Sequence, residues 1–423
     1  MSSLFSGAAA SSVSISPYAE SAASLELTGN LRLLGAFLHF PDRPPFPDDD
    51  GLLAGVGRLI LKGDLAAEVN YDIHAFIDLS RGPTGGLGGT FSTAGSFVTP
   101  YRTQYLAWSF WSDGAVRGQM GIDRAMVHAR AGRFDFTAGR FPVNDSVTHL
   151  FTPNDFFAPF SATAINKTYK PGVDAVRVGL SLGRLSALEV TGVLGSDANG
   201  TPAWGRSAVV VRANTVLAGF DLALTGGKLA ERWFAGGTFQ GDLGPINVRG
   251  EGHVGFADAN GDGKLDAPDA RGQTPAQSPA KIHGRLAAGA GWRSTFHNFS
   301  VEAEYAFFSD GAQGAADYLT RAARFFPDDL PYLGQHYVGV AATIDPLAIL
   351  HLGAVALVNA TDGSGAAVAS LTYDVSDESV LTAGLLAPWG MRPSVEPGTQ
   401  VVSLRSELGL LPLTAFLECR IHF

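Results

Sequence analysis

The segment Leu413-Thr-Ala-Phe-Leu-Glu-Cys-Arg-Ile-His-Phe423 alternates between two kinds of side chain along its whole length. One set of alternate positions is mainly aliphatic, whereas the other contains Glu418, Arg420 and His422. Because successive side chains of a β-strand point to opposite faces, we expect a strand with one apolar and one charged face. Half-buried strands also occur in soluble sandwiches. Full charges on one face of many strands, however, are typical of a transmembrane β-barrel, which has lipid outside and water inside.

The same alternation recurs along most of the chain. Its clearest example is the segment 65–79, in which apolar residues alternate with Glu68, Asp72, His74 and Asp78. Such segments number about 18, in a range of about 16–18, when the aromatic segment 103–111 is left out as ambiguous between strand and loop. The sequence therefore predicts an all-β fold over residues 24–423, a transmembrane antiparallel up-and-down β-barrel. A soluble protein made of several sandwiches is the alternative.

The connections between these segments fall into two lengths. The connections that begin near residues 41, 81, 141, 258, 310 and 389 are long. Barrels of the bacterial outer membrane have short periplasmic turns and long extracellular loops, so this asymmetry supports the barrel. The short connections are polar, as expected of turns, and comprise Lys62–Asp64, Gly183–Arg184, Asp242–Gly244, His297–Asn298 and Asp345–Pro346.

The composition excludes several classes of protein. The 423 residues contain 30 basic and 40 acidic side chains, and the net charge of −10 does not suit a nucleic-acid-binding protein. No apolar run approaches the roughly 20 residues that a membrane-spanning helix needs. The single cysteine, Cys419, cannot form an intramolecular disulfide, and we expect it to face lipid as a small apolar residue.

Residues 1–23 do not fit the barrel pattern and are expected to be a residual leader or a disordered amino terminus. The small residues of Ala19-Glu-Ser-Ala-Ala23 resemble the end of a secretion signal. However, this segment has no Lys or Arg, which a signal peptide normally carries at its start. We interpret the start of the sequence as truncated or misassigned.

The chain as a whole resembles the porin-type barrels of the Gram-negative outer membrane. The resemblance rests on the alternating final strand with its terminal Phe423 and on long loops at one rim, and it covers roughly residues 24–423. The segments Gly139-Arg-Phe-Pro-Val-Asn-Asp-Ser-Val-Thr-His-Leu-Phe-Thr-Pro-Asn-Asp-Phe-Phe-Ala-Pro-Phe160 and Lys170-Pro-Gly-Val-Asp-Ala175 also resemble the strand, infolded loop and strand of alginate-export-like and related monomeric barrels.

If the apolar faces contact lipid, the charged faces line a lumen. We expect the basic residues near 249–285 and the acidic residues near 68–78 to lie on different walls and to produce a transverse field across a water-filled pore. The alternative is that these charges pair with one another and fill a closed lumen. The candidate pore-lining residues are Glu68, Asp72, His74, Asp78, Arg249, Glu251, His253, Lys281, His283, Arg285, Glu302, Glu304, Glu418 and Arg420.

The excursion 141–172 is the candidate constriction. Its phenylalanines and prolines predict a compact segment, and the resemblance implies that it folds into the mouth or lumen. Asn154, Asp155, Lys167 and Lys170 would then be selectivity residues. The alternative is an external loop packed on itself.

The loop 258–279 contains a candidate calcium site. In the twelve residues Asp258-Ala-Asn-Gly-Asp-Gly-Lys-Leu-Asp-Ala-Pro-Asp269, oxygen ligands recur at the spacing of a calcium-binding loop. Position 12 is Asp instead of Glu, and the flanks are not helical, so we expect a structural Ca²⁺ ion and no regulatory EF-hand. A merely acidic turn is the alternative. The expected ligands are Asp258, Asn260, Asp262, Lys264 through its carbonyl, Asp266 and Asp269.

Together these features predict a porin-like channel in the bacterial outer membrane for passive transport of hydrophilic solutes. No nucleophile is singled out beside the histidines, so no enzyme activity is expected. The alternative function is export of a secreted polysaccharide, in which Tyr101, Tyr105, Trp108 and Trp111 would stack on sugars instead of forming an interfacial girdle. The expected partners are outer-membrane lipid, the solute or polysaccharide, and, as the resemblance implies, the barrel-assembly machinery through Phe423, with no nucleic acid.

Overall fold

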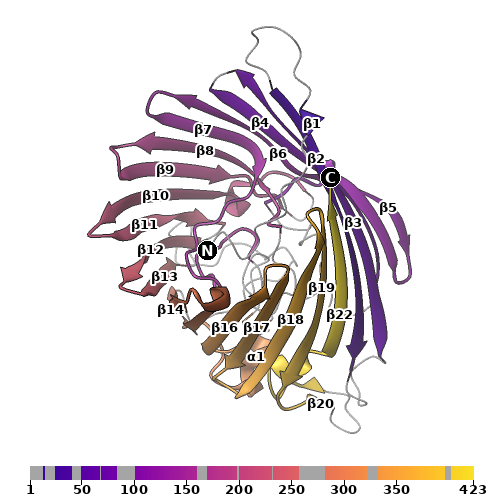
Figure 1. Ribbon diagram of the computed structural model, residues 1–423. Helices are drawn as coiled ribbons and strands as arrows, with labels where there is room; N and C mark the ends of the chain where they lie inside the picture. Colours follow the sequence, from indigo (N-terminus) through magenta and orange to yellow (C-terminus); the bar gives the residue numbers. More distant parts are fainter. Residues whose placement is uncertain are drawn as a thin grey trace.

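The structure is a computed structural model, and it describes residues 13–14, 24–40, 49–66, 68–82, 101–159, 169–197, 200–230, 232–256, 282–322, 332–395 and 402–423. Eighteen antiparallel strands among the described residues pair in sequence order. Figure 1 shows that the wall closes into a barrel. The strands are β2 (Ser24–His39), β3 (Asp50–Ala66), β4 (Val69–Arg81), β6 (Val116–Ala131), β7 (Phe134–Phe141), β8 (Val173–Ser181), β9 (Ser186–Val193), β10 (Ala208–Leu217), β11 (Phe220–Leu229), β12 (Arg232–Leu243), β13 (Ile246–Phe256), β14 (Ile282–Arg293), β15 (Ser300–Phe308), β16 (His336–Leu347), β17 (Leu350–Asn359), β18 (Ser364–Ser376), β19 (Ser379–Trp389) and β22 (Leu413–His422).

The first and last strands of this ring pair with each other and close it. The register of β2 with β22 runs from Asn30 opposite His422 to His39 opposite Leu413. Beyond it, Gly29 and Phe423 exchange two backbone hydrogen bonds of 2.7 and 3.0 Å. The short strand β1 (Val13–Ser14) pairs with the start of β2. The predicted antiparallel barrel of about 18 strands is therefore confirmed.

The two faces of the wall distinguish a membrane barrel from a soluble sandwich. On β22 the apolar Leu417 is 53% exposed, whereas its charged neighbour Glu418 is 5% exposed. The same reversal holds on β4, where Ile77 is exposed and Asp78 is buried. In a soluble sandwich the apolar face would be the buried one. The outward face is thus apolar and the inward face polar, as lipid outside and water inside require.

Exposed aromatic side chains lie near both rims of the barrel. Phe134 and Trp292 lie near one rim, and Trp233 and Trp389 near the other. Aromatic side chains favour the two interfaces of a membrane, where an apolar ring can remain close to water. Their placement is consistent with two girdles bounding an apolar band.

The two rims carry different connections. At the rim where β2 begins, the hairpins are closed by 67–68, 132–133, 182–185, 218–219, 244–245, 294–299, 348–349 and 377–378. We call this the short-turn rim. At the other rim, the long-loop rim, lie the strand ends that flank 40–49, 82–115, 142–172, 194–207, 257–281, 309–335 and 390–412, and also those that flank the short connections 230–231 and 360–363.

Two expected turns lie inside strands. β3 continues to Ala66, so that Lys62 pairs with Asp72 and Asp64 with Asn70. Likewise, β16 continues through Asp345 and Pro346 to Leu347. Near a rim, polar side chains can contact water while their backbone remains hydrogen-bonded in the sheet. A prediction from polarity alone therefore put these turns a few residues before the ends of the strands.

The ambiguous segment 103–111 contains a strand that lies outside the ring of 18. β5 (Ala107–Asp113) pairs with residues 116–121 of β6, on the edge opposite β4 that β7 occupies nearer the short-turn rim. Its side chains Trp108 and Trp111 are exposed. The remaining described elements are small: η2 (Gln104–Leu106), η3 (Trp204–Arg206), η4 (Phe296–Asn298), η5 (Ala315–Asp317), α1 (Tyr318–Ala322), η6 (Leu408–Leu410), and β20 (Ser394–Val395), which pairs with β21 (Val402–Ser403). Among the described residues, the search for a helix long and apolar enough to cross a membrane found none.

The orientation of the two faces gives a first testable prediction. Replacing outward Leu417 by Arg should destabilise the folded barrel in lipid by about 2–4 kcal/mol, because a charge would enter hydrocarbon. Thr382→Arg, on the inward face opposite Glu418, is the control and should cost less than about 1 kcal/mol. Equilibrium unfolding in liposomes measures both. Equal costs for the two variants would contradict the assignment of the faces.

Candidate functional site

A loop crosses the interior of the barrel and defines the candidate site. The chain leaves the wall after Phe141 at the end of β7, and the described part of the loop, 142–159, runs inside the ring (purple in Figure 1). We call this segment the lumen loop. The described residues of the lumen loop contact inward-facing residues of β13 and β15 through their side chains and backbone.

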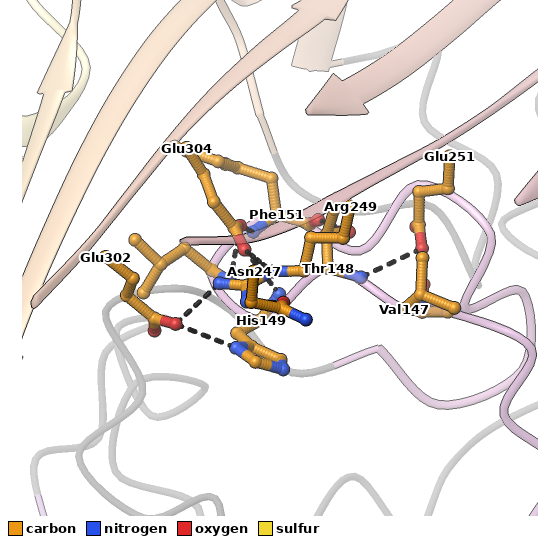
Figure 2. A network of polar contacts seen from close by, with 11 residues as sticks. Val147, Thr148, His149, Phe151, Asn247, Arg249, Glu251, Glu302 and Glu304 are labelled. Carbon is orange, nitrogen blue, oxygen red and sulfur yellow. Dashed lines mark hydrogen bonds and ion pairs between the residues drawn. The ribbon is translucent and has the colours of Figure 1, made fainter. Parts of the chain in front are cut away.

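Two carboxylates of the barrel wall hold the backbone of the lumen loop. Glu304 of β15 accepts hydrogen bonds from the backbone N–H groups of His149 and Leu150 at 2.8 Å, and from that of Phe151 at 3.2 Å. Figure 2 shows these groups converging on the wall. A segment without regular secondary structure has backbone N–H groups that no neighbouring strand satisfies. Here a carboxylate supplies the missing acceptors.

Glu251 of β13 also accepts hydrogen bonds from the backbone of the lumen loop. Its carboxylate accepts from the backbone N–H groups of Val147 (2.5 Å), Thr148 (3.2 Å) and Asn154 (3.0 Å), and from the Ser146 hydroxyl (2.6 Å). Hydrogen bonds to an ionised acceptor are shorter and stronger than neutral ones. The loop is therefore fastened at several consecutive residues.

A buried arginine balances part of this acidic wall. Arg249 of β13 donates from Nη2 to Glu302 at 2.5 Å and from Nε to Glu304 at 2.9 Å. Its side chain is 2% exposed, and that of Glu304 is fully buried. The basic residues of β13 and β14 and the acidic residues of β4 lie on separate parts of the ring. Arg249, however, has its acidic partners on the nearby strand β15. Arg249 neutralises only part of the negative charge of this wall, and its own positive charge is compensated locally, which reduces its share in the expected transverse field.

The apolar tip of the lumen loop inserts between strands and external segments. Phe151 is fully buried, with its ring centroid 5.8 Å from that of Tyr332 and 5.9 Å from that of Tyr337. The adjacent Leu150 lies against Gly339 of β16, where an added Cβ would come within 2.6 Å of the leucine Cδ1. Glycine at this wall position leaves room for the loop.

The far end of the same excursion contacts the opposite wall. Tyr169 lies between two arginines, with Arg58 of β3 3.5 Å and Arg124 of β6 4.2 Å from its ring centroid. Its hydroxyl bonds to Asp123 at 3.3 Å and to His74. Around the ring, β6–β12 separate β4 from β13 on one side, and β16–β19, β22 and β2 separate β15 from β3 on the other. The two ends of the excursion therefore contact opposite walls.

Further contacts join the two ends and fill the side between them. Lys170 forms an ion pair with Asp155 of the lumen loop, and its carbonyl accepts from Arg124 at 2.7 Å. Phe156 and Phe157 belong to a buried apolar cluster with inward residues of β8–β12, such as Val193 and Val210. These contacts close the long-loop half of the lumen beside β8–β12.

Another buried carboxylate, that of Glu407, lies in the described part 402–412 of the last connection, next to β16 and β17. Glu407 accepts from the Tyr337 hydroxyl, from Asn359 Nδ2 at 2.7 Å and from the backbone N–H of Leu333 at 3.0 Å. Burial raises the pKa of the Glu407 carboxyl to about 7, although these donors act to lower it. Because its pKa is raised in the folded protein, Glu407 adds to the free energy of unfolding most fully below the ordinary pKa of 4.5. This stabilisation is lost as the pH rises through about 7.

The other residues singled out in the sequence are distributed over the wall. Asp72 pairs with His74 at 2.5 Å, Arg285 with Asp310 at 2.7 Å, and Glu418 with both Arg32 and Arg420. His253 lies beside His283, with ring centroids 5.8 Å apart, and its Nδ1 is 3.0 Å from Asn154 Oδ1. Asp78 is buried on the inward face of β4.

Several of the predicted residues have no place in the lumen that the structure describes. Glu68 is in the exposed turn between β3 and β4, because β3 continues to Ala66. Lys167 and Lys281 lie outside the described residues, as does the whole calcium loop with Asp258, Asn260, Asp262, Lys264, Asp266 and Asp269.

Sequence reasoning missed three groups that hold the interior together. Tyr169, the Arg58–Asp123 pair and Glu407 come from segments that lack a clear alternating pattern or lie far apart in the chain. For Arg58 a signal existed, because it is the one charged residue in the otherwise apolar segment 52–61. For Glu407 the sequence offered none.

Comparison with known proteins identifies the fold. The sequence matches no protein-family model and no curated protein. The structure is similar to OccAB4 of Acinetobacter baumannii, with 9% identity, TM-score 0.54, and coverage of 94% of this chain and 98% of that one. It is also similar to OccK2 (OpdF) of Pseudomonas aeruginosa, with 8% identity, TM-score 0.55, and coverage of 94% and 97%. A BenF-like porin from Pseudomonas fluorescens has 9% identity, TM-score 0.52, and coverage of 94% and 98%. The fold is that of the outer-membrane porins.

The wall carboxylates give a second testable prediction. Arg249→Met should destabilise the barrel by about 3–5 kcal/mol, because it leaves Glu302 and Glu304 buried without their cation. Adding Glu302→Gln to Arg249→Met should restore part of that loss, since it removes one of the two uncompensated charges. Urea unfolding in detergent micelles measures both variants. No difference between the single and the double variant would show that the charges are compensated elsewhere.

Proposed function

We propose that this protein is an outer-membrane channel through which hydrophilic solutes pass passively. The observation that carries the proposal is the reversed wall, apolar outside and polar inside, around a lumen that is only partly filled. Inward residues of β18 and β19, such as Ser370, Thr372 and Thr382, remain partly exposed although they face the barrel interior. Water therefore reaches the short-turn half of the lumen.

A cavity on the other side of the interior supports the same proposal. It has a volume of about 230 Å³ and is lined by Val147 of the lumen loop and by polar groups that include Arg212, Asn214, Thr238 and Gln240. Cavities lined by hydrogen-bonding groups hold water or polar solutes. OccK2 of Pseudomonas aeruginosa, which shares the fold, has been observed in complex with glucuronate. A small hydrophilic solute of this size suits the lumen proposed here.

The lumen loop is proposed as the constriction of the channel. It extends from wall to wall at the level of Glu251 and Glu304, and the described candidates Asn154, Asp155 and Lys170 are part of it or of its far end. A loop in this position narrows the lumen to a path for small solutes. For this reason we do not favour export of a polysaccharide, whose chain needs a continuous wide passage. Of the four residues considered for sugar stacking, Trp108 and Trp111 are exposed on β5, Tyr105 is exposed just before it, and Tyr101 is fully buried.

The proposal places the chain as an integral barrel of the bacterial outer membrane, with the short-turn rim in the periplasm. It assigns no catalytic role to any residue. Recognition of Phe423 by the barrel-assembly machinery stays a prediction from the sequence.

Planar-bilayer conductance tests the proposed function. The purified protein should produce discrete single-channel steps in KCl solution. Glu251→Ala, which removes the acceptor of three backbone N–H groups of the lumen loop, should increase the mean conductance or its noise because the constriction is loosened. Glu68→Ala, in the exposed turn at the short-turn rim, is the control and should leave the conductance unchanged. A folded protein that inserts without conducting would refute the proposal.

We also propose, on the sequence alone, that the loop 258–269 binds a structural Ca²⁺ ion. The oxygen ligands at positions 1, 3, 5, 9 and 12 and the glycine at position 6 support this proposal. Isothermal titration with CaCl₂ should show one site, which Asp262→Ala should abolish, whereas Asp242→Ala at the end of β12 should not. Unchanged binding by Asp262→Ala would refute the assignment.

A further inference from the structure

The lumen loop carries three titratable side chains within its described residues, and they differ in exposure. The side chain of Asp145 is 11% exposed and paired with Arg212, and that of Asp155 is 4% exposed and paired with Lys170. His149 is 35% exposed. Because this side chain lies inside the barrel, the water that contacts it is lumen water. His149 is therefore the titratable group that the loop presents most fully to a solute in the lumen.

The position of His149 along the barrel axis follows from its partner. Its Nδ1 lies 2.9 Å from Glu302 Oε2, and Figure 2 shows the imidazole at the edge of the network, below the wall groups. β15 runs from the short-turn rim towards the long-loop rim, so Glu302 is nearer the short-turn rim than Glu304. The imidazole therefore faces the half of the lumen in which inward residues remain partly exposed.

The charges around His149 come from two strands. β15 contributes Glu302 and Glu304, and β13 contributes Arg249 and Glu251. The three carboxylates and the single guanidinium leave a formal charge of about −2 when the imidazole is neutral, and protonation changes this to about −1. The carboxylates are buried in a low-dielectric wall, so their field is directed into the lumen instead of being screened at once by water.

We propose that His149 sets the ion selectivity of the channel at the lumen loop, favouring cations when neutral and losing that preference when protonated. The inference rests on the proposed channel function and deepens it. Histidine is the side chain that changes its charge between about pH 5 and pH 8. Protonation places a positive charge against Glu302 at the surface that a permeating ion passes. The channel thus has a lower cation preference in acid than at neutral or alkaline pH.

The test is the permeability ratio of K⁺ to Cl⁻, obtained from reversal potentials in a KCl gradient at pH 8 and at pH 5. In the wild-type protein the ratio should fall by about threefold on acidification, the effect of one unit charge acting across several ångströms of water. His149→Gln, which keeps a donor for Glu302 but cannot be protonated, should hold the high ratio at both values of pH. His149→Lys should hold the low ratio at pH 8.

A second histidine serves as the control. His351, at the short-turn rim, contacts Asp345 at 2.8 Å and Asp374 at 3.2 Å, away from the lumen loop. His351→Gln should retain the pH-dependent fall in the ratio. The inference would be overturned if the permeability ratio fell on acidification as much in His149→Gln as in the wild type, or if it did not change in the wild type. Neither result would contradict the proposed channel function. A protein that never conducts would overturn the proposed function itself, and the inference with it.

Discussion

The structure depends on the requirement that every backbone polar group in contact with hydrocarbon has a partner. In a sheet this requirement is met throughout the wall only if the first and last strands pair, because an open edge would expose unpaired N–H and C=O groups to lipid. The pairing of β2 with β22 meets this requirement. The backbone hydrogen bonds between Gly29 and Phe423 continue the pairing to the last residue of the chain. Once the ring is closed, each strand must turn its apolar side chains outwards. The charged side chains then face the interior.

The same requirement governs the interior. The lumen loop has no strand beside it, so its backbone N–H groups need acceptors from elsewhere, and the inward carboxylates Glu251 and Glu304 supply them. Buried carboxylates are costly unless several donors or a cation satisfy them. Here Arg249 supplies the cation, and the backbone N–H groups of the lumen loop supply the donors. The loop and the acidic wall are therefore mutually dependent: each supplies the partners that the other lacks.

This dependence explains why the interior has two distinct halves. Towards the long-loop rim, aromatic residues of the loop pack with inward apolar residues, as Phe151 does with Tyr337 and Phe156 with Phe234. Towards the short-turn rim, the inward side chains of β18 and β19 are small or hydroxylated and remain in partial contact with solvent. The lumen loop lies at the boundary, where the polar side chains that face it determine what a solute encounters.

Much of the fold could be predicted from the sequence, since the alternation of apolar and charged residues depends only on the period of a strand. That period identified the strands of the ring and the faces of Glu418 and Leu417, and it indicated that the segment after Phe141 is not part of the wall. Turn positions were less well determined, because Lys62 and Asp64 are polar yet paired in the ladder. The partners of each inward charge were decided only by the tertiary structure. Closure brings Arg249 beside Glu302 and Glu304, and Tyr169 between Arg58 and Arg124, across distances in the chain that no local pattern encodes.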